Sequence, residues 1–176
     1  MNLGAIRTEG IDFTLQWEAD LHAAGAVGIN SRFTRLLSYN VQSVPGGPMQ
    51  EWAGTLGAGL LYSPATSGST APQPRWRGLT NLHYRYQGSE VSLRWRFISG
   101  MTDPNAIAGF SPAGTPNYSL FDLSVQDALR KGLILRAGVN NLFNRQPPTI
   151  TYPGLTLASI YDVVGRSFYV GVQARY

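Results

Sequence analysis

The ionisable side chains of this sequence follow extended segments and form no recognisable catalytic motif. Asp12, Glu18 and Asp20 all occupy even positions of one segment. Paired carboxylates can serve as general acid and base, but residues at even spacing along a strand share one face, where solvation explains them. His22 and His83 are the only histidines and there is no cysteine, so no metal site of the His/Cys type is indicated. Serine-elbow and phosphate-loop patterns are absent as well. We therefore predict that the protein is not an enzyme and carries no cofactor or metal.

Arginine dominates the remaining charged residues. The formal net charge is +4, and the 14 basic residues are all arginine except Lys131. They are scattered and form no basic run, so nucleic-acid binding is not predicted. Several charged residues fall at polar positions of alternating segments, where two interpretations stay open: attraction of anionic ligands such as ferric chelates, or a solvated wall with ion pairs. These residues are Arg32, Arg94, Arg96, Asp122 and Arg136.

A group of asparagines and prolines follows one of the alternating segments. Asn140, Asn141 and Asn144 are expected to satisfy the backbone where a strand turns into a loop, because asparagine tolerates unusual dihedral angles. Contact with a substrate is the alternative interpretation. Pro147 and Pro148 are then expected to end the strand pairing, because proline has no amide donor.

Apolar residues recur at every second position over much of the chain, which is typical of strands with one apolar and one polar face. The final segment shows this best, with Phe168, Val170, Val172, Ala174 and Tyr176 on its apolar side. Seven such segments occur, at 11–21, 27–39, 76–86, 91–97, 121–129, 133–140 and 168–176. Most exceed the roughly 5 to 6 residues of a soluble strand and match the roughly 9 to 11 of a tilted membrane strand. Only 14% of the residues are charged, against roughly 25% in soluble domains.

The connections between these segments alternate between short and long. Short links at 22–25, 87–89 and 130–132 contrast with stretches rich in Pro, Gly, Ser and Thr at 42–74, 102–116 and 143–162. Outer-membrane barrels have short periplasmic turns and long extracellular loops. We therefore predict an all-β, antiparallel up-and-down meander of about seven long strands. Because bacterial barrels have an even number of strands, this meander is expected to be an incomplete segment, with Met1 extracellular and Tyr176 periplasmic.

Four passages resemble the C-terminal barrel of TonB-dependent outer-membrane receptors. Residues 137–148, AGVNNLFNRQPP, are similar to the penultimate-strand motif of the family, and residues 161–176, YDVVGRSFYVGVQARY, look like its closing strand. Residues 118–125, YSLFDLSV, are a weaker match to the strand before them. Residues 2–12, NLGAIRTEGID, resemble a phrase found well before the end of such receptors. The passages occur in the expected order over nearly the whole chain.

This resemblance implies that residues 1–176 are the C-terminal part of a barrel of about 22 strands with an N-terminal plug. The plug and the earlier strands have no counterpart in the sequence. The implied function is active uptake of a scarce nutrient, such as a ferric siderophore, cobalamin or an oligosaccharide, across the outer membrane of a Gram-negative bacterium. The implied partners are outer-membrane lipid, the barrel-assembly machinery, an unknown small-molecule substrate and the energy-coupling TonB complex, which acts through the plug.

The resemblance also gives the last strand a role. Phe168, Val170, Val172, Ala174 and the terminal Tyr176 are implied to form a recognition signal for barrel assembly. The alternative interpretation is an ordinary last strand whose terminal aromatic lies in the interfacial girdle, and both interpretations can hold together.

Two other architectures remain open at this point. A self-contained eight-stranded outer-membrane protein, such as an adhesin or a structural protein, requires another strand, and the only spare sequence is 54–62. Its alternation is poor, and a strand inside a loop would spoil the short-long order. A soluble β-sandwich or lipocalin-like binding protein would instead bury the apolar faces in a compact core.

Overall fold

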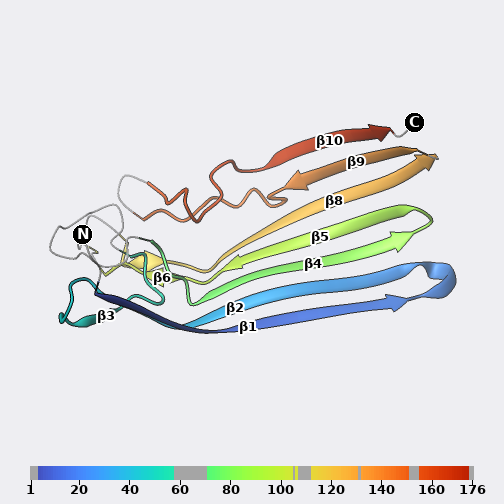
Figure 1. The fold of residues 1–176 in the computed structure, drawn as a ribbon. Helices are drawn as coiled ribbons and strands as arrows, with labels where there is room; N and C mark the ends of the chain where they lie inside the picture. The colour runs from blue at the N-terminus through green and yellow to red at the C-terminus, as the bar shows by residue number, and fades with distance from the viewer. Residues whose placement is uncertain are drawn as a thin grey trace.

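The main part of the fold is one large, curved antiparallel sheet (Figure 1). The computed structural model describes residues 4–57, 71–104, 106, 112–130, 132–150 and 155–174. Seven long strands lie side by side in the order of the sequence: β1 (Ala5–Asp20), β2 (Ala26–Gln42), β4 (Trp76–Tyr86), β5 (Ser89–Ile98), β8 (Tyr118–Arg130), β9 (Leu133–Asn140) and β10 (Ser167–Ala174). The sheet is not closed into a barrel. The predicted all-β meander is therefore confirmed.

Three short strands lie in the long connections. β3 (Met49–Glu51) pairs with β2, and β6 (Met101–Thr102) pairs with β7 (Gly114–Thr115). None of the three was predicted. Thr55, in the segment considered for an eighth strand, makes only isolated bridges to Gln73 and Thr102. The described part of that segment therefore adds no strand to the main sheet, and residues 58–62 lie outside the described residues.

The short connections gather at one end of the sheet and the long ones at the other (Figure 1). A 3-10 turn, η1 (His22–Ala24), joins β1 to β2. Gln87 and Gly88 join β4 to β5 with φ angles of 48° and 88°, the two positive values that a type I′ hairpin turn requires. β1 and β10, the two edge strands, point the same way (Figure 1), as the ends of an odd-numbered meander must. Among the described residues, no helix is long and apolar enough to span a bilayer.

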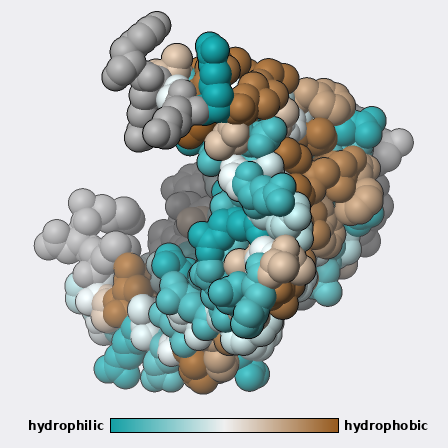
Figure 2. Space-filling view, turned by 90° about the vertical axis from the view of Figure 1, so that its right-hand side faces the viewer, coloured by the Kyte–Doolittle hydropathy of each residue, from teal (hydrophilic) through white to brown (hydrophobic). Residues whose placement is uncertain are grey.

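The two faces of the sheet differ sharply in polarity. One row of mutually paired residues crosses all seven long strands and is wholly apolar: Trp17, Ile29, Leu82, Leu93, Leu123, Val139 and Phe168. The adjacent row, on the other face, is wholly polar over its first five members: Gln16, Asn30, Asn81, Arg94 and Asp122. Figure 2 shows hydrophobic residues along the convex outside and hydrophilic residues along the hollow inside. This division produces the predicted period of two.

The apolar face of the last strand is exposed. The exposed fractions are 73% for Phe168, 75% for Val170 and 67% for Val172. A soluble sandwich would bury such a face under a second sheet. Exposure of this kind instead suits contact with lipid.

The buried core of the protein lies among the long connections. Residues from three connections and from the start of β8 form it: Leu56, Met101, Tyr118, Leu120, Ile150 and Tyr161. Ile98, Leu157 and Ile160 pack against this cluster. The described parts of the connections, predicted simply as irregular surface loops, thus share one apolar core.

Three aromatic rings lie across glycines on the neighbouring strand. Phe33 is paired with Gly78, His83 with Gly28, and Tyr169 with Gly138. A β-carbon built on Gly78 would lie 2.1 Å from the Phe33 ring. A β-carbon on Gly28 or Gly138 would lie 2.5 Å from its partner ring. Any side chain at these positions would have to displace a ring.

Candidate functional site: the polar inner wall

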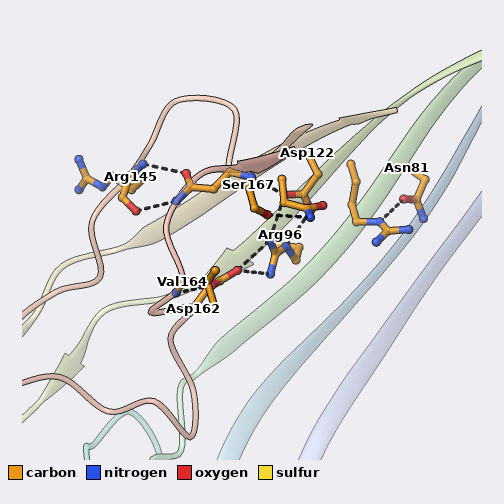
Figure 3. Close-up of polar contacts among 10 residues, drawn as sticks. Asn81, Arg96, Asp122, Arg145, Asp162, Val164 and Ser167 are labelled. Atoms are coloured by element: carbon orange, nitrogen blue, oxygen red, sulfur yellow. Dashed lines mark hydrogen bonds and ion pairs between the residues drawn. The ribbon is translucent and has the colours of Figure 1, made fainter. Parts of the chain in front are cut away.

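An ion-pair network joins two strands of the inner wall to the last long connection (Figure 3). Arg96 of β5 donates from Nε to Oδ2 of Asp122 and from Nη2 to Oδ1, both at 3.0 Å. This is the bidentate geometry that makes arginine–carboxylate pairs strong. Asp162, from the connection 141–166, lies 3.4 Å from the same guanidinium. Asp122 on β8 is only 8% exposed, and its Oδ1 also accepts the backbone N–H of Asn141 at 2.9 Å.

The predicted wall residues do not form one cluster. Arg96 and Asp122 are brought together, although Arg94 is the residue directly opposite Asp122. Arg94 instead donates to Oδ1 of Asn81 at 3.1 Å, and Arg136 donates to Oε1 of Gln126 at 2.9 Å. All of these residues lie on the concave face. Arg32 lies on the same face and lines a groove with Arg77, Leu79 and Arg96.

The asparagine turn after β9 behaves as predicted for two of its three residues. Asn141 and Asn144 both have φ of 52°, in the left-handed region. The side chain of Asn141, 1% exposed, accepts the Arg145 N–H at 2.7 Å and donates to the Arg145 carbonyl at 3.0 Å. Asn140 is still within β9 and donates to Ser167 Oγ at 3.1 Å.

The predicted role of the prolines in ending this strand is wrong. β9 ends at Asn140, well before Pro147 and Pro148. The left-handed backbone of Asn141 turns the chain out of the sheet first. The prolines therefore lie in a connection that has already left the ladder.

Sequence reasoning missed the two residues that hold the last connection against the wall. Asp162 binds Arg96, and Tyr161 is 2% exposed with its ring edge-on to Tyr118 at 5.2 Å between centroids. The Tyr161 hydroxyl donates to Thr115 Oγ1 at 2.9 Å. Burial raises the pKa of Tyr161, and the hydrogen bond with Thr115 offsets only part of that increase. The hydroxyl therefore stays protonated at neutral pH and remains a donor.

Tyr161→Phe is expected to lower the free energy of unfolding by about 1 kcal/mol, because it removes one buried hydrogen bond and keeps the ring. Urea unfolding in detergent of the complete barrel that contains these residues, followed by tryptophan fluorescence, measures the change. Tyr118→Phe is the matched control, since the buried Tyr118 hydroxyl has no hydrogen-bond partner among the described residues. The control should be no less stable than the parent, and equal losses in both variants would contradict the assignment.

Metal ligands do not gather within the described residues, which contain no group of three or more His, Cys, Asp or Glu side chains suited to an ion. His83 lies over Gly28 on the concave face and His22 lies in the η1 turn. The positions implied for the assembly signal, Phe168, Val170, Val172 and Ala174, all lie exposed on β10, and Tyr176 is outside the described residues. Their role as a signal stays a prediction.

Comparison with known proteins finds a matching family, whereas no curated protein shows significant similarity to the chain. The family described as TonB dependent receptor-like, beta-barrel, matches residues 1–142 of the 176. This range covers the passages at 2–12 and 118–125 and ends within the one at 137–148, so the resemblance at 161–176 stays a prediction. The matched strands carry the apolar convex face and the polar concave face described above. The chain therefore belongs to the TonB-dependent receptor β-barrel family, a family of outer-membrane transporters and not of enzymes.

Proposed function

We propose that the chain forms the C-terminal section of the barrel wall of an active transporter for a scarce nutrient, such as a ferric siderophore, cobalamin or an oligosaccharide. The opposite polarity of the two faces carries this proposal. The convex face, with Trp17 and Val170 exposed, contacts outer-membrane lipid. The concave face, with Arg94, Arg96 and Asp122, lines the hydrated path.

The two open edges support a larger barrel. Within the described residues, β1 and β10 each present one unpaired row of backbone N–H and C=O groups. In lipid each unpaired group costs several kcal/mol, so a stable barrel needs both edges paired. Because both edge strands point the same way, an odd number of further antiparallel strands would join them. On this proposal those strands, and the plug through which the TonB complex acts, come from outside residues 1–176.

The proposal is tested by the coding sequence and by uptake. The reading frame upstream of Met1 is expected to continue through a plug domain and more strands. Cells that lack the gene, or carry it without residues 1–176, should lose energy-dependent uptake of one of the three nutrient classes. Cells with an inactive TonB complex should show the same loss. Unchanged uptake of all three classes would contradict the proposal.

A further inference from the structure

An open groove of 360 Å³ lies on the concave face near the long connections. It is bordered by β2, β4 and β5 and by Ile160 of the last connection. Arg77 follows the first residue of β4, and Ile98 is the last residue of β5. The groove is therefore at the mouth of the wall, where a solute arriving from the side of the long connections would first meet it.

Two arginines in this groove form no ion pair with any described residue. Arg32 is paired with Leu79, and Thr34 with Arg77. Arg32 and Arg77 are thus diagonal neighbours on adjacent strands, about 7 to 8 Å apart. All 10 Asp and Glu residues lie in the described part of the chain, and none forms an ion pair with either arginine. The carboxylate nearest in register, Asp12, accepts a hydrogen bond from Thr34 at 2.6 Å.

Arg96, the third arginine of the groove, forms ion pairs within the protein. Arg96 is occupied by Asp122 and Asp162 and so holds the last connection against the wall. Through Asp162 it keeps Ile160, two residues earlier, at the edge of the groove. Arg96 therefore shapes the groove and leaves Arg32 and Arg77 as its unpaired cations.

Apolar side chains supply the rest of the lining. Leu79 and Ile98 interrupt the polar face, since each is paired with an arginine, Leu79 with Arg32 and Ile98 with Arg77. Leu79 is 38% exposed, a large apolar surface for a wall facing water. Ile160 adds a third apolar residue. Two guanidinium groups without an ion-pair partner thus lie beside a strip that water solvates poorly.

We propose that this groove binds a soluble anion with an apolar body, such as an aromatic or aliphatic carboxylate. The carboxylate oxygens accept hydrogen bonds from Arg32 and Arg77, and the apolar body covers Leu79, Ile98 and Ile160. Arginine suits this role because its planar donors match a carboxylate. The inference rests on the proposed function, in which the concave face lines the path of a nutrient, and it adds a chemical class for part of that nutrient.

Calorimetric titration of the intact receptor in zwitterionic nanodiscs with 1-naphthoate tests the inference, with empty nanodiscs as the blank. Arg77→Gln and Arg32→Gln are each expected to weaken binding by about tenfold or more, as for loss of a charge-assisted hydrogen bond. Arg85→Gln is the matched control, because Arg85 lies on the same face of β4 at the opposite end and pairs with Glu18. It should bind like the parent. The uncharged 1-naphthalenemethanol should bind more weakly and respond to none of the three changes.

Several results would overturn this inference. One is that the parent does not bind 1-naphthoate, and another is that both groove variants bind it as the parent does. A third is that Arg85→Gln loses as much affinity as the groove variants, which would indicate a general effect of charge. The outcome of the uptake experiment is independent of the outcome of the binding experiment. Loss of naphthoate binding in the groove variants without TonB-dependent uptake would leave the subsite standing and remove the transport proposal. Normal TonB-dependent uptake, together with unchanged naphthoate binding by the groove variants, would support the transport proposal and remove the subsite.

Discussion

Val172→Arg is expected to block assembly of the barrel that contains this segment. Val172 lies on the convex face of β10 with 67% of its surface exposed. The cost of an arginine that faces lipid depends on its depth and reaches about 2 to 4 kcal/mol at the bilayer midplane. The receptor variant should therefore lose the heat-modifiable band that folded barrels show on gels of outer-membrane fractions, and unfolded protein should accumulate.

Two further variants separate the causes of that loss. Gly171→Arg places the same charge on the concave side, where nothing lies within 4 Å of a new β-carbon, and should assemble normally. Leu15→Arg places it on the convex face of β1, 53% exposed and far from the last strand, and should fail like Val172→Arg. Assembly of Leu15→Arg alone would instead point to the proposed recognition signal. Normal assembly of Val172→Arg would mean that the two faces are assigned the wrong way round.

Asp122→Ala is expected to cause a large loss of stability. Removing one partner of a buried ion pair costs about 3 to 5 kcal/mol because the other charge is left unpaired. The Arg96 side chain is 36% exposed and keeps Asp162, so water and the second carboxylate reduce the expected loss to about 2 to 3 kcal/mol. The midpoint of urea unfolding of the intact receptor in detergent measures this loss of stability when the denaturant slope is the same in both proteins.

Asp162→Ala provides the comparison for this network. Asp162 is 24% exposed and its contacts with Arg96 are longer, at 3.4 Å. Its removal should therefore destabilise the protein by less than half as much as Asp122→Ala. A larger loss for Asp162→Ala would show that the last connection, and not the strand-to-strand pair, carries the energy of the network.

The long strands are predictable because their alternation is a local property. For residues such as Phe168, Val170 and Val172, the alternation of the neighbouring residues is enough to predict which face of the sheet they occupy. β3, β6 and β7 are only two or three residues long, too short to establish a period. The shared core of Leu56, Ile150 and Tyr161 was equally invisible, because these residues lie singly in irregular segments and meet only when the connections fold together.

The inner wall was predictable as a face but not as a set of contacts. Alternation places Arg94, Arg96 and Asp122 on polar positions, yet it cannot say which arginine Asp122 binds. Direct pairing favours Arg94, whereas the side chain reaches diagonally to Arg96. Asp162 contacts Arg96 across 66 residues of sequence, from a connection without any periodic signal. The sequence alone does not single out Arg77 and Leu79, because only the strand register shows that they lie beside Arg32.

The rings that lie over glycines help to set the register between neighbouring strands during assembly. A slip of one residue between neighbouring strands turns their apolar faces inward and is rejected by lipid. A slip of two residues keeps every residue on its proper face, so hydrophobicity cannot detect the error. Such a slip would place Phe33 opposite Trp76 or Thr80, neither of which leaves the hollow that Gly78 provides. The ring–glycine pairs on β2, β4, β9 and β10 thus distinguish correct alignment from the misalignments that the two-residue repeat leaves equivalent.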